Sequence, residues 1–206
     1  MAALTQDLFL EADVIEERRT RGLDHFDEVW EGTYVMALMA NNQHQRIVNE
    51  LATISTVNVD WQRLGQTFPG VNVSDRRVDW TDNYRVPDLA VFMNDTAAEN
   101  HDTFWYGGPD FAVEIVSRGE QPLDKVSFYA SVGTRELLVI QCDSWKLQLF
   151  RGNDARLELV GVSDLESMQT LRSEVLPLNW QLVRDQEGEA LIVTHQARDQ
   201  HWRVRV

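Results

Sequence analysis

Residues 111–141 read FAVEIVSRGEQPLDKVSFYASVGTRELLVIQ, and this stretch decides the fold class. It opens on a short apolar run at 111–116 and closes on a near-continuous apolar run at 136–141, which is typical of a strand covered on both faces. Between them, residues 123–132 are predicted to form a helix that stops at Gly133, a residue suited to the left-handed position just past a helix end. Strand, helix and strand in this order predict a β-α-β unit and an α/β fold.

The segments on either side of this unit extend it into a larger sheet. Upstream, residues 29–39 predict two short strands around a Glu31-Gly32 turn, and Asn41 and Asn42 offer caps for a helix that runs to about Ser55. We therefore predict a mixed β-sheet flanked by helices, with an N-terminal β-hairpin and extra C-terminal strands. The strands predicted outside the unit and the hairpin are residues 71–73, 86–92, 145–150, 156–162, 176–183, 190–195 and 202–206.

The length of 206 residues fits a single domain. We treat residues 1–206 as that domain, with 1–24 as an N-terminal extension and 184–206 as a C-terminal strand extension. The single cysteine, Cys142, excludes an internal disulfide framework and indicates a reducing compartment. No apolar run reaches the roughly 18–20 residues of a membrane span, and residues 1–21 lack the basic start and apolar middle of a signal peptide. We expect a cytoplasmic protein.

The charge balance limits the partners that the chain can bind. Its 33 acidic and 19 basic side chains give a formal net charge of −14. This argues against a broad electrostatic grip on nucleic acid, because phosphate binding usually requires a basic face. The basic residues are 17 arginines and only two lysines, Lys125 and Lys146, so each lysine calls for an explanation.

Three charged residues in the central segments could carry chemistry. Asp88 follows Pro87 at the start of an apolar strand, Glu114 lies inside the next strand, and Lys125 lies on the helix that follows. Two carboxylates on adjacent strands can fix a divalent cation and leave water free to attack a phosphate, while a lysine orients that water or neutralises developing charge. The alternatives are that Glu114 faces a solvated edge or pairs with an arginine, that Pro-Asp is an ordinary turn, and that Lys125 lies on a solvated helix face.

Together these residues resemble the PD-(D/E)XK nuclease superfamily and, within it, the bacterial Uma-two family, whose members are described as restriction endonucleases. The matching segments are RVPDLAV at 85–91, PDFAVEIVS at 109–117, Lys125 with Tyr129 and Gly133, and ELLVI at 136–140. The resemblance covers roughly residues 25–183 and implies a restriction endonuclease-like fold. It further implies DNA cleavage that depends on Mg²⁺ or Mn²⁺, metal ligation by Asp88, Glu114 and the main-chain carbonyl of Ile115, a catalytic role for Lys125, and a homodimer.

Weaker elements of the same resemblance lie outside this core. Glu31-Gly32 is similar to a shortened form of the family's Glu-x-x-x-Gly hairpin, His44 begins a segment similar to its His-x-x-Ile helix, and residues 173–180 resemble its closing Ser-x-x-Leu-Pro segment. Two features depart from the wider superfamily. Val116 stands where the lysine usually follows on the acidic strand, so that Lys125 on the next helix takes the role, and the loop at 117–124 is short, which puts the reach of Lys125 in question.

Several further residues have both a functional and a structural interpretation. Asp110 is either a supporting acid or a strand-opening turn, and we favour the turn. We interpret His44 as a structural histidine rather than a ligand or base. Tyr129, one helical turn after Lys125, either positions that lysine or packs in the core. Phe104-Trp105-Tyr106 could stack on bases, although such a cluster is more often core or interface.

Three functions therefore stay open on the sequence alone. The first is a magnesium-dependent endonuclease that hydrolyses DNA phosphodiester bonds. The second is a catalytically degenerate binding or dimerisation module, which a salt-bridged Glu114 and an absence of divalent-ion binding would favour. The third is hydrolysis of RNA or another phosphate ester by the same site. DNA binding by so acidic a chain requires a local positive strip, and we predict that Arg76, Arg77, Arg85 and Arg118 gather around the cleft.

Overall fold

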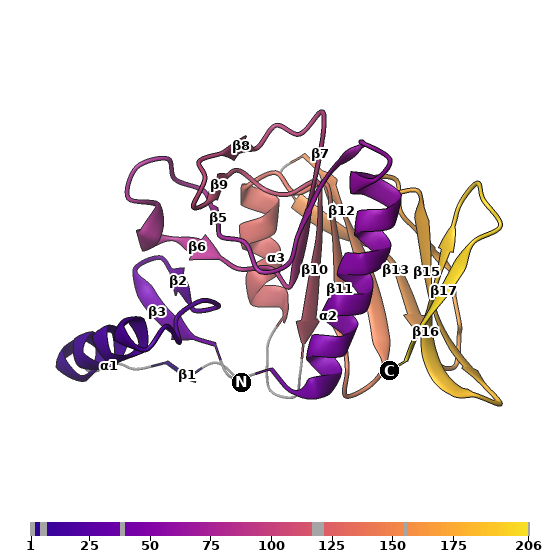
Figure 1. Cartoon of the computed structure of the whole chain (residues 1–206), viewed down its shortest axis with the longest axis horizontal. Helices are drawn as coiled ribbons and strands as arrows, with labels where there is room; N and C mark the ends of the chain where they lie inside the picture. The colour runs from indigo at the N-terminus through magenta and orange to yellow at the C-terminus, as the bar shows by residue number, and fades with distance from the viewer. Residues whose placement is uncertain (1–2, 5–7, 38–39, 117–121, 155, 206) are drawn as a thin grey trace.

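The computed structural model describes residues 3–4, 8–37, 40–116, 122–154 and 156–205 of the chain. These residues form a mixed α/β fold in which three β-sheets are combined with a few helices (Figure 1). None of the helices formed by these residues is long and apolar enough to cross a membrane. The helices are α1 (Leu8–Thr20), α2 (Asn42–Ser55), the π-helix η1 (Thr56–Asp60) that continues α2, the short 3-10 helix η2 (Trp80–Asp82), and α3 (Pro122–Ser131).

A six-stranded sheet forms the centre of the molecule. Its strands β10 and β11 run parallel and are joined by α3, which confirms the predicted β-α-β unit, and the other neighbouring pairs are antiparallel. The mixed sheet predicted from the sequence is therefore present. In spatial order its strands are β13 (Arg156–Asp164), β12 (Lys146–Asn153), β11 (Glu136–Gln141), β10 (Phe111–Val116), β7 (Leu89–Met93) and β4 (Gly65–Phe68).

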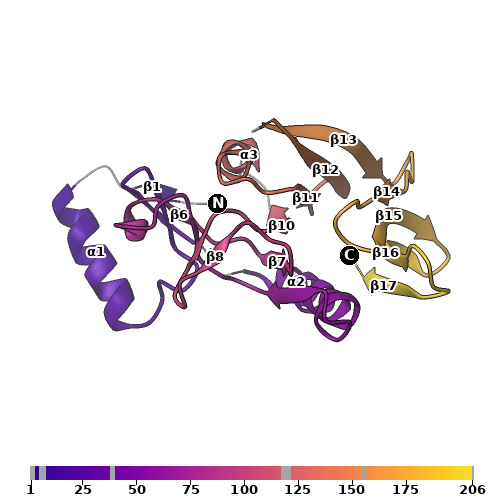
Figure 2. The same ribbon diagram turned by 90° about the horizontal axis from the view of Figure 1, so that it is seen from above.

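Each face of the central sheet is covered by a different helix. Seen from above, α2 and α3 lie on opposite sides of the β7 and β10 strands (Figure 2). Ile47 and Leu51 of α2 pack with the odd-numbered apolar residues of β10, such as Val113, while Phe128 and Tyr129 of α3 pack with the even-numbered ones. The central strands are therefore apolar on both faces, as the continuous apolar runs in the sequence predict.

A second sheet joins the N-terminal hairpin to the segments before and after β7. The hairpin strands are antiparallel around the predicted Glu31-Gly32 turn, and Val29 pairs with Tyr84 of the next strand. This pairing brings the start of the chain against the segment that leads into β7. In spatial order the strands are β1 (Ala3–Leu4), β3 (Thr33–Met36), β2 (Glu28–Trp30), β6 (Tyr84–Arg85), β5 (Val73–Ser74), β9 (Trp105–Tyr106) and β8 (Glu99–Asn100).

The C-terminal residues form a third, antiparallel sheet instead of extending the central one. It packs on the α2 side, where the buried Trp180 stacks on Phe111 of β10 with ring centroids 5.5 Å apart. The predicted late strand pair is present as its last two strands (Figure 1). The strands are β14 (Leu171–Arg172), β15 (Leu178–Asp185), β16 (Gly188–His195) and β17 (His201–Arg205).

The predicted boundaries hold where the local signal is strong and shift where a turn competes with a strand. Helix α2 begins after Asn41, whose side chain accepts a hydrogen bond from the His44 amide at 2.8 Å, as expected of a helix cap. Gly133 follows α3 with a φ of 83°, the left-handed conformation that glycine adopts without strain. Strand β7 begins at Leu89 rather than at residue 86, because Pro87 has no N–H to contribute to the ladder.

Candidate functional site

Glu114 lies in the middle of β10 and its side chain is only 6% exposed. Alternate residues of a strand face opposite sides of the sheet, so Glu114 shares the α3 side with Ala112 and Val116, whereas Ile115 faces α2. A carboxylate in this position costs several kcal/mol unless other groups satisfy it. Its partners are a lysine and a tyrosine, so neither a solvated edge nor an arginine pair explains this buried carboxylate.

Helix α3 supplies both of these partners. Lys125 and Tyr129 are one turn apart and therefore lie on the same face of the helix. The Lys125 Nζ lies 3.0 Å from Glu114 Oε2, and the Tyr129 hydroxyl donates to Glu114 Oε1 at 2.5 Å. Residues 117–121 of the short loop lie outside the described residues, but Lys125 does reach the strand. Tyr129 fixes the orientation of Glu114 rather than that of Lys125.

Asp88 stands directly before β7, at the end of its ladder with β10. The pairing of these two strands ends at Leu89 and Val113. Beyond it, the Asp88 side chain takes the place of the next strand residue, since its Oδ2 accepts the Ile115 amide hydrogen at 2.7 Å. Its other oxygen, Oδ1, lies 3.1 Å from Nε2 of His44 on α2. Both oxygens of Asp88 are thereby fixed at the edge of β10.

Glu28 of the N-terminal hairpin completes a cluster with Asp88, Glu114 and Lys125. The sequence analysis missed Glu28. Its Oε1 lies 2.8 Å from Lys125 Nζ and accepts the Val86 amide hydrogen at 2.8 Å, while its Oε2 accepts from the Trp30 indole at 2.7 Å. A usable signal was present in the sequence. When the full Glu-x-x-x-Gly spacing is counted back from Gly32, its glutamate is Glu28 and not Glu31.

The cluster contains more carboxylates than ammonium groups, and this excess affects the pKa values of Glu114 and Lys125. Burial raises the pKa of Glu114 to about 7, and the negative charges of Asp88 and Glu28 act in the same direction, against the opposing effect of Lys125 and the Tyr129 hydroxyl. Burial alone would lower the pKa of Lys125, but the Glu114 and Glu28 carboxylates raise it above its usual value. Burial, followed by the nearby carboxylates, raises the pKa of Tyr129. Lys125 is therefore an ammonium ion, and Tyr129 a neutral hydrogen-bond donor.

The residues of the cluster fit a divalent cation. The Ile115 N–H faces Asp88, and because the N–H and C=O of one strand residue point to the same side, its carbonyl lies on the same edge of β10. Among the described residues, no group of three or more His, Cys, Asp or Glu side chains is placed to hold a metal ion by itself. Asp88 and Glu114 would thus need main-chain oxygen and water as further ligands, which is usual for Mg²⁺. The carboxylates of Asp88, Glu114 and Glu28 outnumber the single Lys125 ammonium. The remaining formal negative charge is one that a divalent cation would neutralise.

Two of the predicted supporting residues lie outside the cluster. The Glu31 side chain is 71% exposed at the hairpin turn, where it pairs with Arg76 at 2.8 Å. Asp110 directly precedes the first residue of β10, and there its Oδ2 accepts the Met93 amide hydrogen at 2.7 Å. Asp110 is buried and closes the ladder between β7 and β10, so it is more than the simple turn that the sequence favoured.

The predicted positive strip is not formed by the described arginines. Arg76 pairs with Glu31, and Arg77 pairs with Glu99 at 2.5 Å. Arg85 is buried, and burial lowers its pKa. Arg118 lies outside the described residues. These three side chains therefore do not provide the electrostatic support that was expected for DNA binding.

The aromatic run at 104–106 is largely packed inside the protein. Trp105 is buried and stacks on Phe92 with ring centroids 3.7 Å apart. Phe104 is buried as well, and its ring stacks between those of Trp80 and His101. Stacking of nucleobases on Phe104 or Trp105 would require these contacts to open, so the interpretation as core holds for both residues.

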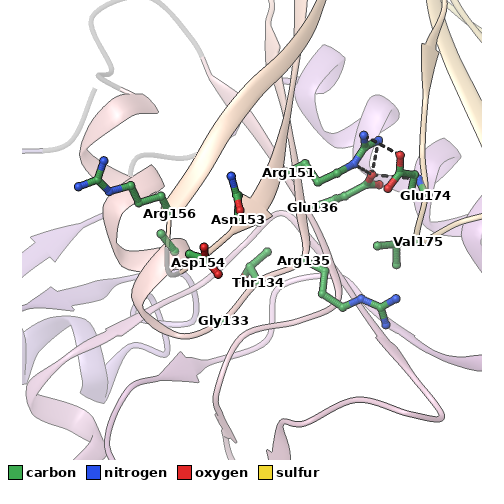
Figure 3. Close-up of a pocket in the computed structure, with 12 residues that line it drawn as sticks. Gly133, Thr134, Arg135, Glu136, Arg151, Asn153, Asp154, Arg156, Glu174 and Val175 are labelled. Carbon is green, nitrogen blue, oxygen red and sulfur yellow. Dashed lines mark hydrogen bonds and ion pairs between the residues drawn. The ribbon is translucent and has the colours of Figure 1, made fainter.

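A cavity of about 410 Å³ lies at the far end of α3, away from the carboxylate cluster. Its wall includes Arg151, whose guanidinium lies between the carboxylates of Glu136 and Glu174 (Figure 3). Glu136 also accepts a hydrogen bond from the Ser173 hydroxyl at 2.5 Å, which ties the predicted Ser-x-x-Leu-Pro segment to β11. These paired groups tie β11 and β12 to the segment between β14 and β15, so the cluster is the better candidate for chemistry.

Comparisons with known proteins agree with this fold. The Uma2 family model, described as "Putative restriction endonuclease", matches residues 20–185. The chain belongs to the Uma2 family. A solved structure, that of a putative nuclease belonging to DUF820 from Anabaena variabilis ATCC 29413, matches with a TM-score of 0.57 and 20% sequence identity, over 71% of this chain and 80% of that one. None of the curated proteins matches the chain.

The Uma2 match contains the whole cluster. Glu28, Asp88, Glu114 and Lys125 all lie between residues 20 and 185. The strands β16 and β17 lie beyond the matched residues. The restriction endonuclease-like fold predicted from the central segments is confirmed.

Proposed function

We propose that this protein is a divalent-metal-dependent endonuclease that hydrolyses phosphodiester bonds of DNA. The observation that carries the proposal is the convergence of Asp88, Glu114 and Lys125 at one edge of β10, with Lys125 Nζ 3.0 Å from the buried Glu114. Two carboxylates and an ammonium in this arrangement match the groups that metal-assisted phosphoryl transfer requires. Membership of a family described as restriction endonucleases supports DNA as the substrate.

Asp88, Glu114 and the Ile115 carbonyl would hold Mg²⁺ or Mn²⁺, and the bound ion would supply Lewis-acid activation of the phosphate and a water nucleophile of lowered pKa. The residues around these ligands keep them in place. His44 and the Ile115 amide fix the two oxygens of Asp88, and the Tyr129 hydroxyl fixes one oxygen of Glu114. Ligands held in this way need little reorganisation when the substrate arrives.

Lys125 acts in this proposal as a cation and a proton donor. Two carboxylates raise its pKa, so it holds its proton and does not serve as the general base. Its ammonium can pair with the negative charge that grows on the phosphate in the transition state. A lysine suits this task better than an arginine where a compact, mobile point charge is needed, and the chain places one of its two lysines here.

The second candidate is a catalytically degenerate module that binds a partner, and one observation favours it. Glu114 is engaged in a salt bridge with Lys125, which is what a structural ion pair would look like. The net charge of −14 and the paired surface arginines also disfavour a monomer that binds DNA unaided. A homodimer would ease this difficulty by offering two sites across a two-fold axis, one for each strand of a duplex.

Plasmid cleavage tests the proposal. The purified chain is incubated with supercoiled DNA and Mg²⁺ or Mn²⁺, alongside Asp88→Ala, Glu114→Ala and Lys125→Ala, with Glu31→Gln as a matched carboxylate control outside the cluster. Nicking by the wild type and the control that is lost in the three variants and on chelation supports the endonuclease. Cleavage of single-stranded RNA or a phosphate ester alone would move the assignment to the other hydrolases. No cleavage of any substrate by a folded wild type supports the binding module.

A further inference from the structure

The Glu28 carboxylate is held from two sides by donors of its own hairpin and of the segment before β7. The Trp30 indole and the Val86 amide each donate to one of its oxygens, and the side chain is only 6% exposed. Glu31, three residues along the same hairpin, is 71% exposed. Glu28 is thus a preset acceptor that points into the protein, and Glu31 provides a natural comparison.

The Lys125 ammonium is shared between two carboxylates that come from different sheets. It lies 2.8 Å from Glu28 Oε1 on β2 and 3.0 Å from Glu114 Oε2 on β10. A cation bound to Glu114 would neutralise that carboxylate and repel the ammonium. The contact with Glu28 would then be the one that keeps Lys125 beside the site.

The hairpin that carries Glu28 is tied to the helix that carries Lys125. The Arg85 guanidinium lies over the Trp30 ring at 4.6 Å and over the Phe128 ring of α3 at 4.3 Å. It also donates to the Val29 carbonyl of the hairpin at 2.9 Å. Such stacking is characteristic of arginine and fixes the two elements relative to each other.

We propose that Glu28 is a positioning residue, which holds the Lys125 ammonium at the site while Glu114 is engaged by a divalent cation. This inference rests on the proposed function, because it assigns a role to Glu28 in the same metal-dependent reaction. It gives the N-terminal hairpin a task in catalysis, although the hairpin lies some 60 residues before Asp88 in the sequence. Glu28 acts through Lys125 and does not itself contact the substrate in this role.

The small number of lysines makes the contact directly measurable. Labelling with ¹⁵N-lysine gives only two side-chain ammonium signals, from Lys125 and from Lys146. Lys146 lies on β12, which is two strands away from β10 in the central sheet. In the wild type we expect the Lys125 ammonium protons to exchange slowly with water, both without and with saturating Mg²⁺. In Glu28→Gln they should exchange at least tenfold faster once Mg²⁺ is added, while Glu31→Gln behaves as the wild type.

Kinetics provides the second readout. A hydrogen bond to a charged group corresponds to roughly a 10- to 100-fold change, so kcat for plasmid nicking should fall by about that factor in Glu28→Gln, with KM for DNA unchanged. Glu28→Asp keeps the charge on a side chain that is one methylene shorter, and should give an intermediate kcat. If Glu28→Gln does not fold, the same two measurements on Glu28→Asp decide the question.

The outcomes separate this inference from the proposed function. If Mg²⁺ shifts no signal of the wild type and nothing is cleaved, the proposed metal-dependent function fails, and the inference about Glu28 fails with it. If Mg²⁺ binds and DNA is nicked, but Lys125 stays protected and kcat unchanged in Glu28→Gln, the positioning role is overturned and the proposed function stands. Loss of Mg²⁺ binding in Glu28→Gln would also overturn it, because Glu28 would then be a metal ligand.

Discussion

Replacing Glu114 with glutamine should change how the stability of the metal-free protein depends on pH. Burial and the neighbouring carboxylates raise the pKa of Glu114 to about 7 in the folded protein, against an ordinary value of 4.5. Below pH 4.5 the group is protonated in both states. Between pH 4.5 and 7 the unfolded chain releases its proton while the folded protein keeps it, so the free energy of unfolding falls as the pH rises and then levels off.

The size of this effect follows from the two pKa values. The difference between 4.5 and about 7 corresponds to a loss of about 3 kcal/mol, at about 1.4 kcal/mol for each pH unit. The glutamine variant has no proton to release and should not show this loss. Lys125 does not interfere, because its ordinary pKa of 10.5 already lies above this window in the unfolded chain and the folded protein raises it further.

Urea unfolding followed by tryptophan fluorescence measures the effect, at several pH values from 4.5 to 8 with a chelator present. The stability of the wild type relative to Glu114→Gln should decrease by roughly 2–3 kcal/mol across that range. Glu31→Gln should follow the wild type, since the exposed Glu31 lies outside the cluster. Parallel curves for the wild type and Glu114→Gln would refute the reasoning that Glu114 is a buried carboxylate of raised pKa.

Three further substitutions separate chemistry from stability. Lys125→Met should lower plasmid nicking at least 100-fold but leave Mg²⁺ binding by calorimetry intact or tighter, because the competing ammonium is gone. Asp110→Asn removes the charge that accepts the Met93 amide hydrogen, so it should cost roughly 1–3 kcal/mol in urea unfolding and leave nicking by the folded protein unchanged. Gly65→Ala would drive its Cβ into the Phe92 carbonyl oxygen, and should lower the melting temperature by several degrees at a cost of about 1–3 kcal/mol.

The central part of the fold could be predicted because local signals there agree with one another. The apolar runs of β10 and β11, the helix between them and the stop at Gly133 all indicate the same β-α-β unit. That unit also brings Glu114 and Lys125 together, since an even-numbered strand residue faces the crossover helix. Asp88 joins them because it begins the neighbouring antiparallel strand.

The parts that could not be predicted depend on long-range pairing. Glu28 and Glu31 are three residues apart, and only the pairing of Val29 with Tyr84 in the folded sheet decides which of them is buried. Arg85 was predicted to join a positive strip around the cleft, but its guanidinium is stacked on two aromatic rings from distant segments. The separate C-terminal sheet is a third case, since strand patterns do not tell which sheet a strand joins.

Titration of Mg²⁺ and of Mn²⁺ into the wild type, Asp88→Ala and Glu114→Ala by calorimetry addresses the metal site most directly. Because the proposal assigns both carboxylates to the metal site, we expect the wild type to bind one ion per chain and each folded variant to lose that binding. Glu31→Gln should bind as the wild type does. A folded wild type that binds neither ion at millimolar concentration would contradict the assignment, and the Glu114–Lys125 pair would then be a structural salt bridge in a binding module.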